Sequence, residues 1–279
     1  MEIARRVDGV IFSVDSMQVY RGMDIGTAKP SIAERTEVPH ELVDIAEPEV
    51  DMSVETIQHI AVERIEVTDR PIVVAGGSGL HFRSIVDPLT FAPHDPDVRA
   101  ALSGLDLGEA VKRLIDLDPD AGAHIDLSNP RRVIRALEVA ELTGMGPSER
   151  ATTPEAVAVR SYRALRPFVG VGVDPGAGIA ARIDARVDAM IEAGLQEEVV
   201  GLADRLGRNA SRAVGYAELI EVIEGRVTLD QAVEAIKANT LKLARRQRTW
   251  FRRDPRISWL PEDIDLDAAV TYCLDRWRP

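Results

Sequence analysis

A short apolar run that ends in a carboxylate constrains the fold of this chain more than any other feature. Residues 10–14 are mostly β-branched and aromatic, which is typical of a strand buried on both faces of a parallel sheet. Asp15 follows at the carboxyl end of that strand. Ligands bind at this edge of open α/β sheets, because the strands and the helices after them leave a crevice there. The run therefore predicts a parallel α/β core with a site around Asp15.

Further patterns extend this core and interrupt it with an insertion. Strands are expected at Ile72–Ala75 and at residues 168–173, and a helix is expected at residues 53–67. After a proline-rich loop the strand patterns stop, and helical patterns continue to residue 142. We therefore expect an α/β core made of residues 1–92 and 160–279. An all-helical subdomain at residues 93–159 interrupts it, and residues 144–154 are expected to form a return linker.

Composition and charge exclude several classes of protein. The 279 residues contain no apolar run long enough to span a bilayer and no apolar leader, which predicts a soluble, cytoplasmic protein without membrane contacts. The single cysteine, Cys273, cannot form an internal disulfide or a cysteine-rich zinc site. The net charge of −12 argues against nonspecific coating of nucleic acid, which requires many neutralised phosphates. A local basic site remains compatible with that charge.

Two roles are open to Asp15 in this position. In a pocket that excludes water, its carboxylate can accept the proton of a weakly nucleophilic amine while that amine attacks an electrophilic carbon. Alternatively, Asp15 or Ser16 merely caps the next turn. The spacing of the residues leaves both roles open.

A glycine-rich turn follows the second predicted strand. Residues 76–80 have the sequence Gly-Gly-Ser-Gly-Leu and open a helix. Glycine lets the backbone approach a ligand, and a helix amino terminus offers unpaired N–H groups to anions. A tight turn from strand to helix explains the same pattern, so neither interpretation is preferred.

Arginines are grouped on several predicted helices. Asn129 and Pro130 begin a helix on which Arg131, Arg132 and Arg135 lie three or four residues apart. Such a row is usually a solvated face. Residues 245–253 combine arginines with Trp250 and Phe251; we interpret these aromatic rings as core and the arginines as a basic surface.

Arg186 lies on another predicted helix, and neither Asp184 nor Glu192 has the ideal helical spacing for an ion pair with it. A guanidinium there would stabilise the charge that develops on a diphosphate leaving group. Arg212 lies in a further segment with the sequence Ser-Arg-Ala-Val-Gly-Tyr.

These motifs together resemble those of the tRNA dimethylallyltransferase family over nearly the whole chain. The resemblance is carried by residues 12–30, by the glycine-rich turn and by the segment around Arg212. It implies a P-loop-NTPase-like parallel sheet flanked by helices, a fold associated with nucleotide or ATP binding. The chain departs from the family pattern at Ser78 and His81, where threonine and tyrosine are usual.

The resemblance also implies an activity and a set of site residues. The family transfers a dimethylallyl group from dimethylallyl diphosphate to N6 of the adenine at tRNA position 37, next to the anticodon. Asp15 would be the catalytic base and Arg186 would bind the diphosphate. The implied contacts to the anticodon stem-loop are Asp15, Ser16, Met17, Gln18, Arg131, Arg132, Arg135 and Arg212. The implied cofactor is Mg²⁺, with no protein metal ligand assigned, and we expect a monomer.

One element of the family pattern has no counterpart in this sequence. The family begins with a phosphate-binding loop, Gly-Pro-Thr-x-x-Gly-Lys-Ser/Thr, and no such motif occurs here. Either the start codon is misplaced and the loop is encoded upstream, or this is a short form that lacks a main anion site. Two other functions also stay open. They are transfer to free adenine nucleotides, as in an adenylate isopentenyltransferase, and tRNA binding by a noncatalytic remnant.

Overall fold

The computed structural model describes residues 1–277, which divide into two units. The first consists of Met1–Ile85 and the residues from Arg166 onward, and the second is Val86–Leu165. The second unit is wider at both ends than the range 93–159 that the sequence predicts. It gains the loop before its first helix and the residues that follow its last one.

A three-stranded parallel sheet in the first unit carries the predicted strand of residues 10–14. β1 (Val10–Ser13) lies between β2 (His40–Glu41) and β3 (Ile72–Ala75). All four residues of β1 are buried, as expected for a strand covered on both faces. The predictions of β1 and β3 are confirmed. β2 was missed because two residues are too few to show a periodic pattern.

Four helices precede, connect or follow these strands. They are α1 (Glu2–Arg6), α2 (Ile32–Glu37), α3 (Val54–Val67) and α4 (Gly79–Val86). Ser53 is the N-cap of α3 and accepts a hydrogen bond from the backbone N–H of Thr56, which satisfies one of the unpaired donors of the first turn. The helix predicted at residues 53–67 is therefore confirmed.

A separate two-stranded sheet contains the third predicted strand. β4 (Gly170–Val173) pairs in parallel with β5 (Ile257–Leu260), and neither strand pairs with β1, β2 or β3 within residues 1–277. β4 starts two residues later than predicted, because Phe168 instead packs edge-on against Phe82, with 5.7 Å between the ring centroids. β5 lies between two helices and was not predicted.

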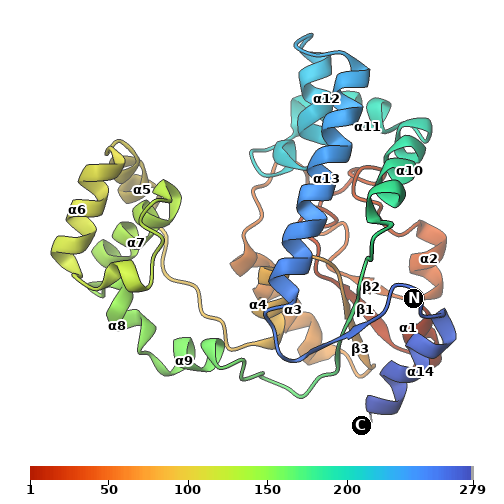
Figure 1. The fold of residues 1–279 in the computed structure, drawn as a ribbon, viewed down its shortest axis with the longest axis horizontal. Coiled ribbons are helices and arrows are strands. Elements are labelled where there is room, and N and C mark those ends of the chain that lie inside the picture. The colour runs from red at the N-terminus through yellow and green to blue at the C-terminus, as the bar shows by residue number, and fades with distance from the viewer. Residues whose placement is uncertain (278–279) are drawn as a thin grey trace. The chain divides into compact units, whose positions relative to one another are not determined.

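The remaining helices of the first unit follow β4. They are α10 (Ile179–Glu192), α11 (Leu195–Leu202), α12 (Tyr216–Ile223), α13 (Leu229–Phe251) and α14 (Leu266–Arg276). The long helix α13 packs against α10 and α12 (Figure 1). Thr228 and Gln231 form a capping box at its start.

The second unit is helical, as predicted. Its helices are α5 (Pro96–Ser103), α6 (Leu107–Leu117), α7 (Pro130–Thr143), α8 (Pro147–Ala151) and α9 (Pro154–Arg160). Leu102, Leu114 and Leu137 are buried together in its core. The linker predicted at residues 144–154 is wrong, since α8 and the start of α9 lie within it. Pro147 and Pro154 are the first residues of these helices, where the missing N–H costs no hydrogen bond.

Within residues 1–277, no helix combines the length and the apolar character needed to cross a bilayer.

Candidate active site

Asp15 lies just beyond the carboxyl end of β1 and closes a tight turn. Its Oδ1 accepts hydrogen bonds from the backbone N–H groups of Met17 at 2.7 Å and Gln18 at 3.3 Å. No residue in the described part of the chain donates to its Oδ2. The turn-capping role is therefore real. It occupies only one carboxylate oxygen and leaves the other open to a ligand.

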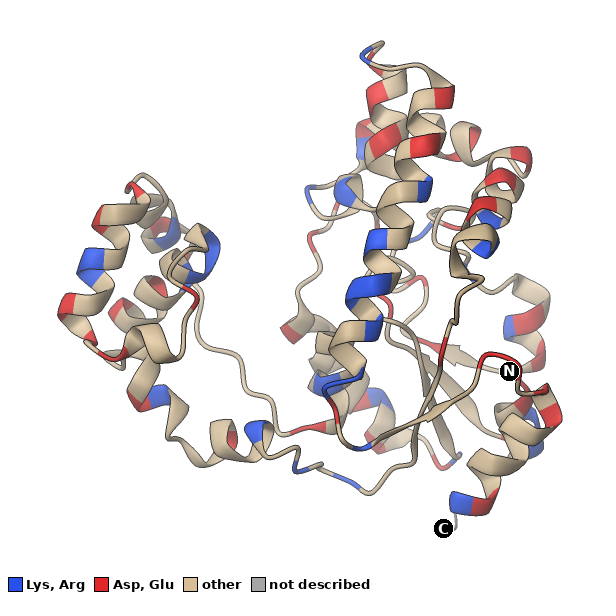
Figure 2. Cartoon of the chain, viewed as in Figure 1, with Lys and Arg blue, Asp and Glu red and all other residues tan. Residues whose placement is uncertain are grey.

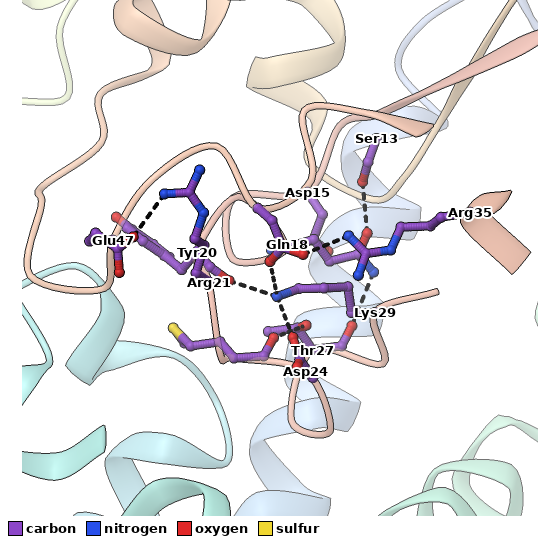
Figure 3. Close-up of polar contacts among 12 residues, drawn as sticks. Ser13, Asp15, Gln18, Tyr20, Arg21, Asp24, Thr27, Lys29, Arg35 and Glu47 are labelled. Carbon is purple, nitrogen blue, oxygen red and sulfur yellow. Dashed lines mark hydrogen bonds and ion pairs between the residues drawn. The ribbon is translucent and has the colours of Figure 1, made fainter. Parts of the chain in front are cut away.

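Gln18 joins the end of β1 to the loop at residues 27–28. Its Oε1 accepts a hydrogen bond from the hydroxyl of Ser13 at 2.8 Å (Figure 3). Its Nε2 donates to the backbone oxygens of Thr27 at 3.1 Å and Ala28 at 3.3 Å. Both the oxygen and the nitrogen of this amide are hydrogen-bonded within the protein, so Gln18 fixes the turn that carries Asp15. A contact from Gln18 to tRNA stays a prediction.

Lys29 is buried under the same loop. Its side chain is 1% exposed, and its ammonium contacts the carboxylates of Asp24 at 2.5 Å and Asp44 at 2.7 Å (Figure 3). It also donates to the backbone oxygen of Tyr20 at 2.7 Å. Arg35 holds the second oxygen of Asp44. Burial alone would raise the pKa of Asp44, but hydrogen bonds from Lys29 and Arg35 lower it.

Glu198 of α11 binds the backbone of the loop at residues 24–26. Its carboxylate accepts the backbone N–H groups of Asp24, Ile25 and Gly26, with distances of 2.7–3.1 Å. The hydroxyl of Tyr216 donates to the same carboxylate at 2.5 Å. Burial, and then the neighbouring Glu198, raise the pKa of Tyr216, so its phenol stays a donor. Residues from α11 and α12 thus fix the loop that follows the site.

The glycine-rich turn after β3 lies against the residue before Asp15. Gly76 has φ +150°, and a Cβ there would come within 2.6 Å of the backbone oxygen of Val14. Ser78 donates its backbone N–H to that oxygen at 3.1 Å. A Cβ on Gly77 would meet the side chain of Gln247. The close approach at Gly76, which only glycine allows, brings the residues before α4 against Val14, the residue that precedes Asp15.

A cavity of about 260 Å³ opens beside this turn. It is lined by Ser16, Met17, Tyr20, Met52, Val54, His81, Asn209 and Arg212. Four separate segments of the first unit contribute to it, and the residues directly after Asp15 form one wall. The structure therefore brings three of the predicted site residues, Ser16, Met17 and Arg212, to one cavity beside Asp15. A volume of this size accommodates a small planar ring.

His81 lies in the first turn of α4 and lines this cavity. It is only 7% exposed. Its Nδ1 is hydrogen-bonded to the hydroxyl of Ser78 at 2.6 Å. Burial lowers its pKa, although the nearby Asp15 opposes that shift. The imidazole is therefore neutral at physiological pH.

Arg186 is exposed on α10, where the sequence places it. It forms no ion pair with any residue in the described range, so the alternative of an intrahelical pair with Asp184 or Glu192 is not realised. Arg182, one turn earlier, instead pairs with Glu262 at 3.0 Å. Arg186 therefore keeps a guanidinium available for an anion.

The arginines of α13 form bands of positive charge along the helix (Figure 2). Arg248 and Arg252 both pair with Asp174, which follows β4. Trp250 packs over Gly79, and Phe251 packs edge-on against Phe82 with 5.9 Å between centroids. The aromatic rings thus belong to the packing between α13 and α4, as the sequence predicts.

In the helical unit, α7 carries the predicted row of arginines after the Asn129 cap. Arg131 and Arg132 are exposed, and Arg132 approaches Asp126 at 3.7 Å. Arg135 differs from them, because it donates to the backbone oxygens of Ala92 and Pro93 and to Glu138. Arg135 therefore stabilises its own unit, and its tRNA contact stays a prediction.

Glu138 is the buried centre of that network. It is 0% exposed and accepts hydrogen bonds from His94, Arg99 and Arg135. Burial alone would raise its pKa, but these donors lower it to about 2. Because the folded pKa is depressed below the ordinary glutamate value of 4.5, this stabilisation is present above that value and is lost as pH falls towards 2.

We expect Glu138→Gln to destabilise the helical unit by about 1.5–3 kcal/mol, because it removes charge-assisted hydrogen bonds from a buried site. The difference in unfolding free energy from the wild type should shrink as pH falls from 4.5 towards 2. Denaturant unfolding monitored by hydrogen exchange in α5 and α7 measures it. Glu141→Gln, an exposed change on the same helix, is the control and should have little effect. An equal loss in both variants would contradict the role of the network.

Comparison with known proteins gives the family. The model of the IPP transferase family matches residues 18–254. This chain belongs to the IPP transferase family. A tRNA dimethylallyltransferase of Parafrankia sp. (strain EAN1pec) is 44% identical over 281 residues, which cover 97% of this chain and 85% of the relative. A protein of the same name from Streptomyces coelicolor is 44% identical and covers 92% of this chain and 84% of its own length.

Solved IPP transferase structures share the fold. The tRNA isopentenylpyrophosphate transferase of Bacillus halodurans has a TM-score of 0.67 and 34% identity, covering 97% of this chain and 88% of that chain. The enzyme of Staphylococcus epidermidis has a TM-score of 0.69 and 29% identity, covering 99% and 92%. A eukaryotic dimethylallyltransferase acting on tRNA has a TM-score of 0.79 at 22% identity, a likeness of fold. The predicted family and its P-loop-NTPase-like fold are confirmed.

The acidic, histidine and cysteine side chains of this IPP transferase bear on the expected Mg²⁺. Within residues 1–277, no three His, Cys, Asp or Glu side chains converge on a point where they would hold an ion. The described residues therefore do not define a Mg²⁺ site. Mg²⁺ is often held by one or two carboxylates together with substrate phosphates. The expected cofactor stays a prediction.

Several residues of the candidate site were not found from the sequence. Asn209, Met52 and Tyr20 line the cavity, and Glu198 supports the loop beside it. Asn209, Met52 and Glu198 lie outside the patterns that indicate chemistry, because an isolated asparagine, methionine or glutamate carries no periodic signal. Tyr20 lies within residues 12–30, but nothing in that segment distinguishes it as a cavity residue. The segment before Arg212 was the available hint, since Asn209 lies three residues from that predicted contact.

Proposed function

We propose that this IPP transferase is a tRNA dimethylallyltransferase that modifies N6 of the adenine next to the anticodon. The observation that carries the proposal is the position of Asp15. It follows a buried strand, keeps one carboxylate oxygen open and directly precedes the lining of a cavity. The relatives named as tRNA dimethylallyltransferases support the same reaction.

In the proposed reaction, Asp15 acts as the general base. Oδ2 accepts a proton from the N6 amine while the nitrogen attacks the first carbon of the dimethylallyl group. A nitrogen–carbon bond forms as the carbon–oxygen bond to the diphosphate breaks, and the bonding electrons leave with the diphosphate. Arg186 stabilises the charge that grows on that leaving group.

Two physical arguments favour an adenine in an RNA loop. The base must leave its stack to enter the cavity, which costs a few kcal/mol and costs least where the base is unpaired. Arg131, Arg132 and Arg212 are exposed and suited to phosphates, which position an RNA without specifying its sequence. We further propose that the protein acts as a monomer in the cytoplasm, with dimethylallyl diphosphate as donor.

The direct test incubates the full chain with dimethylallyl diphosphate, Mg²⁺ and an anticodon stem-loop, and measures the RNA by mass spectrometry. A gain of one dimethylallyl group on the adenine next to the anticodon supports the proposal. Adenosine monophosphate is assayed in parallel. Modification of the free nucleotide alone would identify an adenylate isopentenyltransferase. A gel shift without any mass gain would identify a noncatalytic tRNA-binding protein.

We expect Arg186→Ala to lower the transfer rate by about 10²–10³-fold, as is typical when a preorganised donor to developing charge is lost. Binding of the stem-loop should change little, because the guanidinium acts on the diphosphate. Rates at saturating RNA and varied diphosphate concentration measure the effect. Arg70→Ala is the control. Arg70 lies before β3, at the amino end of the strand and therefore away from the site at the carboxyl end. Within the described chain its guanidinium pairs only with exposed Asp8. Equal rates for the two variants would contradict this role.

A further inference from the structure

His81 is a buried cavity residue that the proposed reaction does not use. It is 7% exposed and lines the cavity with Ser16 and Met17, the two residues that follow Asp15. Its Nδ1 is bonded to Ser78 at 2.6 Å. No second hydrogen bond to the ring is formed within residues 1–277. Its Nε2 is therefore the ring atom left for a molecule in the cavity.

The hydrogen bond between Ser78 and Nδ1 determines whether Nε2 is a hydrogen-bond donor or an acceptor. A neutral imidazole has one donor and one acceptor nitrogen, and the hydrogen bond at one nitrogen fixes the tautomer. We assign Nδ1 as the acceptor of the Ser78 hydroxyl proton, because that proton has no other acceptor in the described chain. The ring hydrogen then resides on Nε2, which becomes a donor. With this assignment the cavity lining includes a donor, Nε2 of His81, and an acceptor, Oδ2 of Asp15, lies on the residue directly before the lining residues Ser16 and Met17.

We propose that His81 is a specificity-determining residue that donates a hydrogen bond from Nε2 to a ring nitrogen of the target adenine. The inference rests on the proposed function. Adenine presents the N6 donor beside a ring-nitrogen acceptor, N1 on one side and N7 on the other. Asp15 and His81 form the complementary pair. Guanine presents O6 in place of the amine, and that oxygen would face the Asp15 carboxylate with no proton between them.

The test replaces single atoms of the substrate and single residues of the protein. Stem-loops with adenosine, 1-deazaadenosine or 7-deazaadenosine at the target position are compared for Kd and for transfer rate. With the wild-type chain, one of the two deaza substrates should lose about tenfold to a hundredfold, as expected for one base contact. His81→Phe should lose as much on adenosine and show no further loss on that same deaza substrate.

Two further variants separate recognition from packing. His81→Gln keeps an N–H group on a side chain of similar reach and should recover part of the loss. His59→Phe, the same kind of change at an exposed position on α3, should leave all three substrates unchanged relative to wild type. Thermal melting of each variant confirms that it is folded. A merely structural role for His81 would weaken all substrates by one common factor.

Measurements on the wild-type protein alone can contradict the proposal. If wild-type protein binds and modifies both deaza substrates as well as adenosine, the proposal is wrong. Additive losses in the His81→Phe comparison would also overturn it. Failure of the proposed function is distinguishable, because the chain would then modify no substrate at all. In that case the Kd values still show whether His81 is coupled to a ring nitrogen.

Discussion

Asp15→Asn is expected to reduce dimethylallyl transfer by about 10²–10⁴-fold, the usual contribution of a positioned general base. Asparagine keeps an oxygen in the place of Oδ1, so the hydrogen bonds from Met17 and Gln18 are retained. The substitution therefore removes the proton acceptor and preserves the turn. Single-turnover rates with saturating stem-loop and diphosphate measure the loss, and Kd for the RNA should stay within a few-fold of wild type.

Asp8→Asn provides the matched control for this experiment. Asp8 lies before β1, at the opposite end of the strand from Asp15, and pairs with Arg70 on the surface. It has φ 49°, a conformation that asparagine also tolerates. This variant should transfer at the wild-type rate. An Asp15→Asn protein that remains fully active would show that the carboxylate serves only to cap its turn.

Lys29→Met is expected to lower the free energy of unfolding by about 1.5–3 kcal/mol, because it removes charge-assisted hydrogen bonds from a buried ammonium, while Arg35 still pairs with Asp44. The ammonium of Lys29 neutralises Asp24 and Asp44 and satisfies the backbone oxygen of Tyr20. Methionine fills a similar volume but leaves these groups without their donor. Chemical denaturation followed by circular dichroism measures the change.

Lys242→Met is the control for this substitution. Lys242 is exposed on α13 and contacts Asn239 at 3.2 Å, so its replacement should change stability by less than about 0.5 kcal/mol. Similar midpoints for the two variants would mean that the buried network contributes no net stability. Activity should fall in Lys29→Met even where it remains folded, because the loop it holds is tied to Asp15 through Gln18.

Local sequence patterns were sufficient to predict the strand and the helices that surround the site. A continuous apolar run is typical of a strand covered on both faces, and β1 is buried at every position. Ser53 and Thr228 lie at the starts of helices, because their hydroxyls satisfy backbone donors within three residues. Such signals are local in the chain. Two-residue β2 carries no pattern of this kind, and the sequence predicts a linker at residues 144–154, where α8 and the start of α9 lie.

Contacts between distant segments decided the roles of individual side chains. Gln18 and Arg135 were both expected at the RNA surface, yet their polar groups are bonded to residues 27–28 and to residues 92–93 and 138. Arg186 has no such partner in the described chain. The sequence shows that a side chain is able to make a hydrogen bond. It does not show whether a partner from another segment comes within reach.

The sequence by itself determined the family, the parallel α/β core and the position of Asp15 at the end of its first strand. These follow from patterns that a few neighbouring residues complete. Only the tertiary structure decided that Ser16, His81, Asn209 and Arg212 share one cavity, and that Ser78 fixes the imidazole of His81. A cavity is made by segments that meet only after the chain has packed. Its lining is therefore set by long-range contacts that no local pattern records.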